Sequence, residues 1–296
     1  MLRWVFGLLS GKHPNSLFRR DRLTHSERIA RTILQTFSLL PANGLVLDAP
    51  AGSGGTSLIL QEIGFKPILV DLFPSRLLKN SLEEKNLPYR ERRMPCVKAD
   101  LNCQLPFRNS SFDYIVSQEG IEHLENQAQF IRECGRILKD GGKLIISTPN
   151  VLHLTGRLAY LLVGQRHLKG GVINEVQTPV SVEHGRIYHG HAFVIDYFRL
   201  RYLLRMAGFR ILRIHATRKS KSSRMLFFLV PLMFCATTLS IHHRLNKDTR
   251  KGRPGYGNLV RQIVREIFSG PLLYGNTIVV EAVKADLPYH LSTGND

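Results

Sequence analysis

Short apolar runs recur along the chain, and segments with helical spacing of apolar residues lie between them. Seven of these runs predict buried strands, at residues 45–47, 67–71, 95–100, 112–117, 143–148, 209–214 and 276–283. Helices are predicted over residues 26–34, 56–63, 128–139 and 197–206, and a further helix is expected to start at Pro74. This alternation indicates an α/β fold, a doubly wound seven-stranded mostly parallel sheet with helical insertions.

A glycine-rich turn separates the first predicted strand from the helix that follows it. The strand ends at Asp48, and the turn contains Gly52 and Gly54. Glycines at these positions would let a ligand reach the backbone, and the start of the next helix offers unpaired N–H groups with a partial positive charge. The turn therefore predicts a ligand site, although a tight turn that binds nothing has the same pattern.

Acidic residues end three successive predicted strands. They are Asp48, Asp71 and Asp100. Ligands of open α/β sheets bind at the carboxyl ends of the strands, and Asp71 follows Gly52 by nineteen positions, which would place it beside the glycine turn. A carboxylate there can hold both ribose hydroxyls of a nucleoside. Each acid alone could be a helix cap or a surface turn, but together they favour a nucleoside site.

The same pattern divides the chain into four parts. Residues 1–40 form a predicted N-terminal helical cap, and 41–216 form the core. Residues 217–275 form a basic and apolar insertion, and 276–296 hold the last strand and a tail. A second excursion, 151–191, follows the fifth strand. Because such additions usually carry substrate specificity while the sheet holds the cofactor, both are expected to contact the acceptor.

Charge changes this picture mainly in the C-terminal third. The net charge is +18, and the stretch from 199 to 265 holds sixteen Lys and Arg residues against one acid, Asp248. Such a field favours an anionic partner, which could be a membrane surface, an acidic glycan or, less favoured, a nucleic acid. The four cysteines show no metal-binding spacing and predict reduced thiols and no structural zinc site.

An apolar run from Met225 to Leu239 lies within this basic stretch. It is shorter than the roughly 20 residues that a membrane-spanning helix needs. Basic residues flank it, which is typical of an interfacial helix pair on an anionic bilayer, although a buried helix or a substrate lid would also fit. The apolar residues 4–9 lack a clear signal-peptide cleavage site. The expected location is therefore cytoplasmic, with peripheral contact to a membrane.

Motifs of this kind, in this order, are found together in one enzyme class. From residue 45 to 214, and in its last strand, the chain resembles a class I S-adenosylmethionine-dependent methyltransferase of the type 11 or ubiquinone O-methyltransferase kind, with a Rossmann-like fold. Pro50 stands where this family has its first loop glycine. The motifs are Asp48 with Gly52-Ser53-Gly54, Asp71, Ala99-Asp100-Leu101, Leu105-Pro106-Phe107 with Phe112-Asp113, Ile121-Glu122-His123-Leu124, and the run from Leu138 to Asn150.

The resemblance implies roles in holding the donor. Gly52 and Gly54 would let the loop pass close to S-adenosylmethionine, and Asp48 would hold its methionine part. Asp71 would bind the ribose, with Leu72 beside the adenine.

The same resemblance implies contacts with the adenine and with the methyl group of the donor. Asp100 would accept a hydrogen bond from the adenine amino group, and Leu101 would pack on the ring. Gln118 and Glu119 follow the fourth strand and would line the methyl-transfer site.

A candidate metal site follows the fourth strand. Glu119, Glu122 and His123 have the spacing i, i+3, i+4, and would share one face if a helical turn begins there. Two carboxylates and one imidazole suit Mg²⁺ or Mn²⁺. The arrangement resembles the Glu-x-x-Glu-His element of small-RNA 2′-O-methyltransferases, whose further histidine would correspond to His191 here. His189 and His184 are alternatives.

The expected catalytic residues are His123 and Glu122. A metal held by them would lower the pKa of the acceptor hydroxyl. His123 could instead act as a base without a metal, or have a structural role.

The predicted function is O-methylation of a lipid-like, glycan or RNA hydroxyl, the acceptor being a small molecule or lipid-linked. One alternative is an NAD(P)-dependent oxidoreductase, but the turn from Gly52 to Ser57 lacks the third small residue of that fingerprint. The other alternative is a non-catalytic module that binds membrane or nucleic acid.

Overall fold

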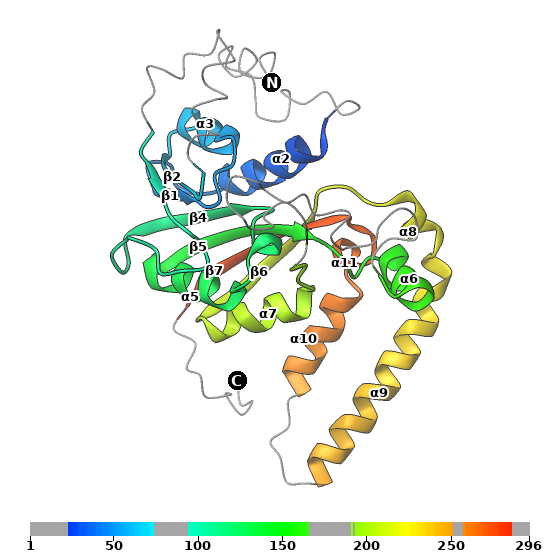
Figure 1. Cartoon of the computed structure of the whole chain (residues 1–296). Helices are drawn as coiled ribbons and strands as arrows, with labels where there is room; N and C mark the ends of the chain where they lie inside the picture. Colours follow the sequence, from blue (N-terminus) through cyan, green and yellow to red (C-terminus); the bar gives the residue numbers. More distant parts are fainter. Residues whose placement is uncertain (1–22, 74–93, 166–190, 192, 251–256, 286–296) are drawn as a thin grey trace.

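A seven-stranded mixed sheet forms the centre of the computed structural model (Figure 1), which describes residues 23–73, 94–165, 191, 193–250 and 257–285. The strand order is β3-β2-β1-β4-β5-β7-β6. The first five strands run parallel, and β7 pairs antiparallel with β5 and β6. The strands are β1 (Leu45–Asp48), β2 (Lys66–Asp71), β3 (Cys96–Lys98), β4 (Phe112–Gln118), β5 (Leu138–Pro149), β6 (Phe209–Ala216) and β7 (Thr277–Lys284).

All seven predicted strands are present, and the predicted fold class is confirmed. The four predicted helices that fall on described residues are also present. They correspond to α2 (His25–Phe37), α3 (Gly55–Glu62), α5 (Gln127–Ile137) and α7 (Tyr197–Met206). The helix expected from Pro74 lies outside the described residues. The strand β5 begins earlier than predicted, so Leu138 and Lys139 belong to it and not to the preceding helix.

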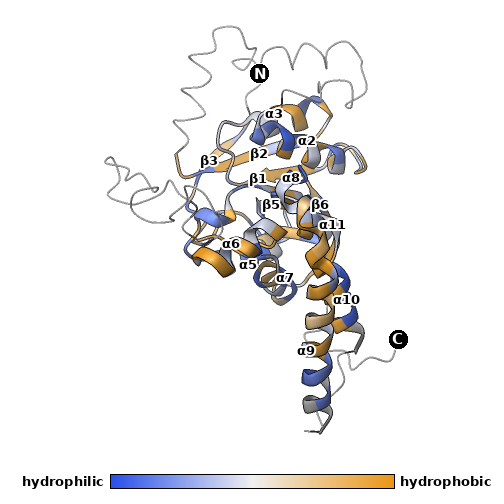
Figure 2. Cartoon of the chain, turned by 90° about the vertical axis from the view of Figure 1, so that its right-hand side faces the viewer, coloured by the Kyte–Doolittle hydropathy of each residue, from blue (hydrophilic) through white to orange (hydrophobic). Residues whose placement is uncertain are grey.

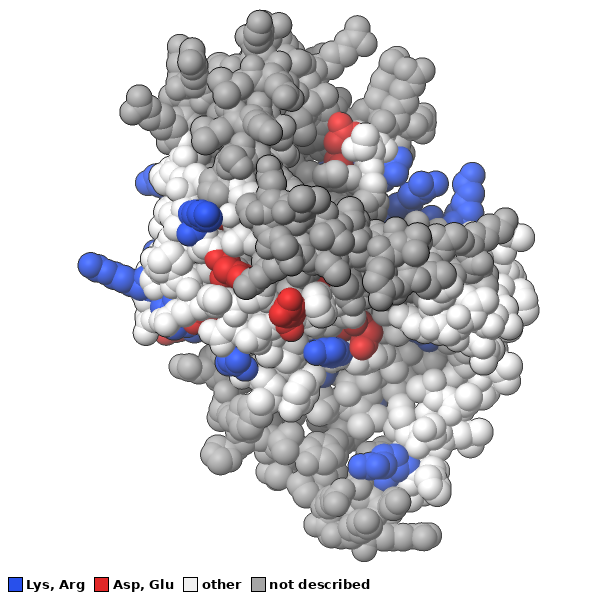
Figure 3. Space-filling view, in the orientation of Figure 1, with Lys and Arg blue, Asp and Glu red and all other residues white. Residues whose placement is uncertain are grey.

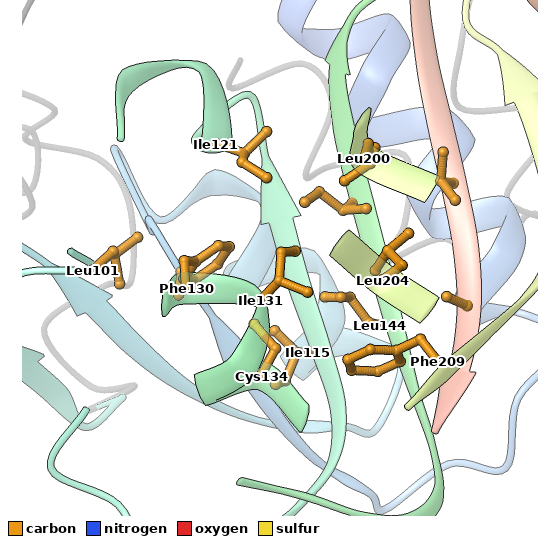
Figure 4. Packing of buried hydrophobic residues seen from close by; sticks show 14 of the residues in the cluster. Leu101, Ile115, Ile121, Phe130, Ile131, Cys134, Leu144, Leu200, Leu204 and Phe209 are labelled. Carbon is orange, nitrogen blue, oxygen red and sulfur yellow. The ribbon is translucent and has the colours of Figure 1, made fainter. Parts of the chain in front are cut away.

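Helices cover both faces of the sheet. In Figure 1 α2 and α3 lie on one face, and α5 and α7 lie on the other. Successive residues of a strand point to opposite faces, so Val46 joins the α2–α3 cluster while Leu47 joins the α5–α7 cluster. Figure 4 shows part of the second cluster, where Ile131 and Cys134 of α5 pack near Leu204. This double layer explains why the parallel strands read as continuous apolar runs.

Apart from the short helix η3 (Ile121–His123), which follows β4, the remaining helices belong to the excursion 151–191 and the insertion 217–275. They are α6 (Leu154–Val163), α8 (Lys221–Met225), η4 (Phe227–Leu229), α9 (Val230–Arg250), α10 (Gly257–Ile267) and α11 (Gly270–Tyr274). The bridge between Lys219 and Gly275 shows that the insertion 217–275 leaves and re-enters the sheet at one place. Glu266 fixes α10 to α7, because its carboxylate accepts hydrogen bonds from the Tyr197 hydroxyl at 2.9 Å and from Arg201 Nε at 2.8 Å.

The apolar run predicted to lie at a membrane surface forms η4 and the first half of α9. Figure 2 shows α9 projecting from the body, apolar near the sheet and polar toward its far end. Within the described residues, no helix combines the length and the apolar character needed to cross a bilayer.

The turn after β4 packs directly against the glycine turn after β1. A Cβ added to Gly120 would overlap the ring of Pro50. Only glycine lets the two turns approach this closely, and both carry residues expected at the donor site.

We expect Gly120→Ala to lower the free energy of unfolding by about 1–3 kcal/mol, because the added methyl group must push the two turns apart. Urea denaturation measures the change. Gly270→Ala is the matched control, since a Cβ there meets nothing within 4 Å. Equal stability of the two variants would show that the turns are not closely packed.

Candidate functional site

The glycine turn after β1 has a backbone that only glycine adopts readily. The φ angles of Gly52 and Gly54 are +55° and +73°, in the left-handed region. Gly54 is the N-cap of α3, and a Cβ at Gly52 would meet no atom within 4 Å. The backbone of the turn is therefore open on the side of Gly52, as expected for a loop that a ligand approaches.

Asp48 lies buried beneath this turn. Its side chain is 1% exposed, and the Ser57 hydroxyl donates a hydrogen bond of 2.6 Å to Asp48 Oδ2. Burial raises the pKa of Asp48 to about 7; the bond from Ser57 acts against this, and the charge of Asp71 adds to it. At neutral pH the carboxyl is therefore shared between its protonated and ionised forms. A cation bound at the turn would favour the ionised form.

Asp71 connects the end of β2 to the glycine turn. It is 8% exposed, and its two carboxylate oxygens accept from the backbone N–H of Gly52 at 2.9 Å and of Phe73 at 2.8 Å. The prediction that Asp71 lies beside the turn is confirmed. Leu72 follows it and is half-buried.

Asp100 lies in the turn after β3 and is half-buried. Its Oδ1 accepts hydrogen bonds from the backbone N–H and the side-chain amide of Asn102, at 2.9 and 3.0 Å. Leu101 is 5% exposed and belongs to the α5–α7 cluster. This turn thus combines a polar acceptor with an apolar side chain anchored in the core.

The N-terminal end of α2 lies across the end of β4. Gln118 accepts from the Thr56 hydroxyl at 2.8 Å and donates to Ser26 Oγ at 3.2 Å. His25 Nε2 lies 3.1 Å from Glu119 Oε2, and this hydrogen bond raises the pKa of His25. The helix predicted as part of the N-terminal cap therefore contacts the end of β4 through its first turn.

Glu119 departs from the predicted arrangement. Its φ is +48°, and the short helix η3 (Ile121–His123) begins after it. The chain turns at this point, so the side chain of Glu119 is directed to His25, and its Oε1 lies 3.5 Å from the Thr277 hydroxyl. The expectation that Glu119 shares one helical face with Glu122 and His123 was wrong, because no helical turn spans these residues.

The three other predicted metal ligands, Glu122, His123 and His191, do come together. Potential ligand atoms of Glu122, His123 and His191 all lie within 4.8 Å of one another. Glu122 is fully buried and accepts from the Thr148 hydroxyl at 3.2 Å, while the two imidazoles are half-buried and stand edge to face with centroids 5.1 Å apart. Glu119 is not a member of this cluster, and the alternatives His184 and His189 lie outside the described residues.

Backbone contacts explain how His191 reaches the cluster from far along the chain. The backbone N–H of Phe193 donates to the carbonyl of Glu122 at 3.1 Å, and the Gln127 side chain donates to the carbonyl of Phe193. The segment that carries His191 is thus fastened to η3 and to the start of α5.

A pocket of about 370 Å³ adjoins the cluster and shares His191 with it. Sequence reasoning missed most of its residues, which come from the ends of β5 and β7, the first turns of α2 and α6, and the start of α8. The only indication of this pocket in the sequence was a group of polar residues in the otherwise apolar segments of the excursion and the insertion. The lining consists of His25, Pro149, Asn150, Val151, His153, Thr155, His191, Ser220, Ser222, Asn276 and Thr277.

Comparison with known proteins agrees with this geometry. A family model described as a methyltransferase domain matches residues 18–214, about two thirds of the chain. A probable S-adenosylmethionine-dependent methyltransferase of Mycobacterium tuberculosis (strain H37Rv) is 33% identical over 105 residues, which cover 36% of this chain and 35% of that protein. A ubiquinone biosynthesis O-methyltransferase of Xanthomonas axonopodis pv. citri is 33% identical over 117 residues, covering 38% and 46%. The chain thus spans less than half the length of these relatives.

A solved structure shares the fold. An S-adenosylmethionine-dependent methyltransferase of Methanosarcina mazei superposes with a TM-score of 0.50 over 85% of this chain and 97% of that chain, at 16% identity. This likeness speaks for the fold alone, whereas the family model speaks for the family. The chain belongs to the methyltransferase-domain family, and its resemblance to the class I S-adenosylmethionine-dependent methyltransferases is confirmed.

Proposed function

We propose that this protein transfers a methyl group from S-adenosylmethionine to a hydroxyl oxygen of an acceptor bound in the polar pocket. The observation that carries the proposal is the cluster of Glu122, His123 and His191, which stands after β4 and adjoins the pocket through His191. A hydroxyl is a weak nucleophile until it loses its proton, and this cluster offers groups that can take that proton or lower its pKa. The ubiquinone biosynthesis O-methyltransferases among the relatives support oxygen as the methyl acceptor.

The donor would lie along the carboxyl ends of β1, β2 and β3. In this arrangement the methionine part sits over the glycine turn, where Asp48 faces its ammonium group, and Asp71 accepts from the ribose hydroxyls. Asp71 is held by the Gly52 and Phe73 N–H groups, so its carboxylate is fixed before the donor arrives. Preorganisation of this kind lowers the ordering cost of binding.

The adenine would lie against the turns after β2 and β3. Leu72 and Leu101 supply apolar contact there, and Asp100 accepts from the adenine amino group. Leu101 is anchored in the core, which gives the ring a rigid partner. Gln118 and Glu119, which stand between the glycine turn and the pocket, would then flank the methyl group.

Methyl transfer asks for alignment more than for activation. The sulfonium methyl is already reactive, so holding its carbon in line with the acceptor oxygen supplies much of the acceleration. The hydrogen bonds of Gln118 with Thr56 and Ser26 hold its side chain in place between the proposed donor site and the pocket. In this proposal His123 takes the hydroxyl proton, and the buried carboxylate of Glu122 stabilises positive charge that develops on the neighbouring imidazoles.

The cluster of Glu122, His123 and His191 also fits a divalent metal ion, although of the two ions that the sequence favoured Mn²⁺ now fits better than Mg²⁺. Without Glu119 the set contains two imidazoles and one carboxylate, which suits Mn²⁺, Fe²⁺ or Zn²⁺ better than Mg²⁺. The ligand atoms would need to close from within 4.8 Å to about 3.4 Å for bonds of ordinary length. A bound ion would polarise the acceptor hydroxyl and lower its pKa.

The pocket lining indicates the chemistry of the acceptor. Hydroxyl, amide and imidazole groups line it, and Asn150 is held rigidly because its side-chain amide donates to the carbonyls of Leu272 and Gly275 at 3.0 and 2.8 Å. Fixed polar groups of this kind recognise a hydrogen-bonding part of a ligand, such as a polyhydroxylated or phenolic head group.

Donor affinity is expected to fall by about tenfold per pH unit as the pH drops below 7, because protonation of Asp48 removes the charge that faces the donor ammonium. Calorimetry with S-adenosylhomocysteine between pH 5.5 and 8.5, a range of about three units around the pKa, measures the profile. Asp48→Asn should bind weakly at every pH, with a flat profile. Asp140→Asn, at a residue whose side chain is 84% exposed, should follow the unaltered protein. A sloping profile in Asp48→Asn would assign the titration to another group.

Mn²⁺ is expected to bind the unaltered protein, and His191→Ala should weaken this binding at least tenfold, since even the loss of an outer-shell partner of a metal ligand typically costs about that much. Calorimetry and the electron paramagnetic resonance of Mn²⁺ report binding without any assay of activity. His243→Ala on α9 removes an exposed imidazole outside the cluster and should have no effect. If His191→Ala binds Mn²⁺ as well as the unaltered protein does, the cluster is not a metal site and His123 acts as a base alone.

The transferred methyl group is expected on oxygen. Incubation of the protein with ¹³C-methyl-labelled S-adenosylmethionine and total lipid and polar extracts, followed by NMR of the labelled fraction, distinguishes O-methyl from N-methyl, S-methyl and C-methyl carbons. His123→Ala should lose at least a hundredfold in rate, the usual contribution of a general base. Labelled N-methyl groups as the main product would contradict the assignment of a hydroxyl acceptor.

A further inference from the structure

Exposed apolar side chains gather on one side of the molecule. Among the described residues, fifteen large apolar side chains are exposed, and ten of these lie on α6, α8, η4 and α9. Leu161 is 80% exposed and Met225 is 75% exposed. We call this set the α6–α9 surface; it consists of Tyr160, Leu161, Leu162, Val163, Met225, Phe227, Phe228, Leu232, Phe234 and Leu239.

The four elements form one continuous surface. Ser223 of α8 joins α8 to α6, since its hydroxyl lies 3.0 Å from His153 Nδ1 and 3.0 Å from the Thr155 hydroxyl. α8 also contacts η4, and η4 contacts α9. Figure 1 draws α6, α8 and the start of α9 on the same side of the molecule. Exposed apolar residues that are scattered singly over a protein surface are common, whereas a contiguous group of them marks an interaction site.

Basic residues border the apolar side chains. Arg218, Lys219, Lys221 and Arg224 are all exposed and directly precede Met225. The sequence from 199 to 265 contains a single acid, Asp248. Figure 3 shows a broad area without acidic side chains on the right of the molecule, where Figure 1 places α6, α8 and α9.

We propose that the α6–α9 surface docks onto an anionic lipid bilayer. Apolar side chains that enter the acyl boundary, bordered by basic side chains at head-group level, are the composition of an interfacial anchor. The finding that α9 is not a spanning helix agrees with contact from one side. A second copy of the chain is a poorer occupant, because face-to-face contact would bring like positive charges together.

Docking would place the polar pocket beside the head groups. The α6–α8 junction that carries the surface also lines the pocket, through His153, Thr155, Ser220 and Ser222. A substrate with its polar head in the pocket could keep an apolar chain in the bilayer. This last step rests on the proposed function, whereas bilayer binding itself does not.

The test is cosedimentation of the full chain with vesicles. We expect binding to vesicles of phosphatidylcholine mixed with phosphatidylglycerol, weak binding to phosphatidylcholine alone, and loss of binding as salt screens the charges. The double variants F227S/F228S and K221E/R224E should each bind the mixed vesicles at least tenfold more weakly.

Two matched controls carry the same changes elsewhere. L39S replaces a 73% exposed apolar residue, and R108E reverses an exposed basic residue on the loop before β4; both should bind as the unaltered protein does. Circular dichroism and S-adenosylhomocysteine binding show that the variants remain folded and that the donor site is intact. A failure of bilayer binding with intact donor binding would overturn this proposal and leave the proposed function standing.

Equal binding to neutral and mixed vesicles, or equal binding by variants and controls, would also overturn it. So would light scattering that shows a dimer of the unaltered protein dissociated by F227S/F228S, with no binding to vesicles. That result would assign the α6–α9 surface to a second copy of the chain.

Discussion

The proposed donor site depends on two carboxylates kept near one exposed backbone turn. Asp71 is held by the N–H groups of Gly52 and Phe73, and Asp48 is buried below the turn, where the Ser57 hydroxyl donates a hydrogen bond to it. Burying a carboxylate is unfavourable unless a charge or donors compensate, which is why the pKa of Asp48 is raised to about 7. A cationic ligand at the turn would offset the cost of burying the ionised Asp48 carboxylate.

The acceptor side is built differently, from segments far apart in the sequence. Glu122 is fixed by Thr148 of β5, and the backbone of Phe193 brings His191 to it. The same edge of the sheet supports the pocket, in which Asn150 connects β5 to the segment around α11. The proposed donor and acceptor sites therefore meet at the end of β4, and the parallel pairing of β4 with β5 holds the two sites beside each other.

Local sequence patterns were sufficient for the seven strands and for the position of Asp71 beside the glycine turn. Strands such as 67–71 and 112–117 are apolar runs because helices cover both faces of the sheet, and a run of this kind is visible in the sequence. The position of Asp71 beside the glycine turn followed from the order of parallel strands. The prediction of a helical turn from Glu119 was wrong, because Glu119 has a left-handed backbone conformation that redirects the chain. The spacing of residue types along the sequence does not reveal the φ angle of one residue.

The sequence by itself determined the alternation of strands and helices, the acids at the strand ends and the basic, apolar character of the insertion 217–275, since each depends on neighbours along the chain. Only the tertiary structure decided which candidate metal ligands meet, that His25 and Ser26 reach the end of β4, and that α6 and α9 both belong to one exposed apolar side of the molecule. Those contacts join residues separated by tens of positions. They depend on how the layers pack, which spacing along the chain does not encode.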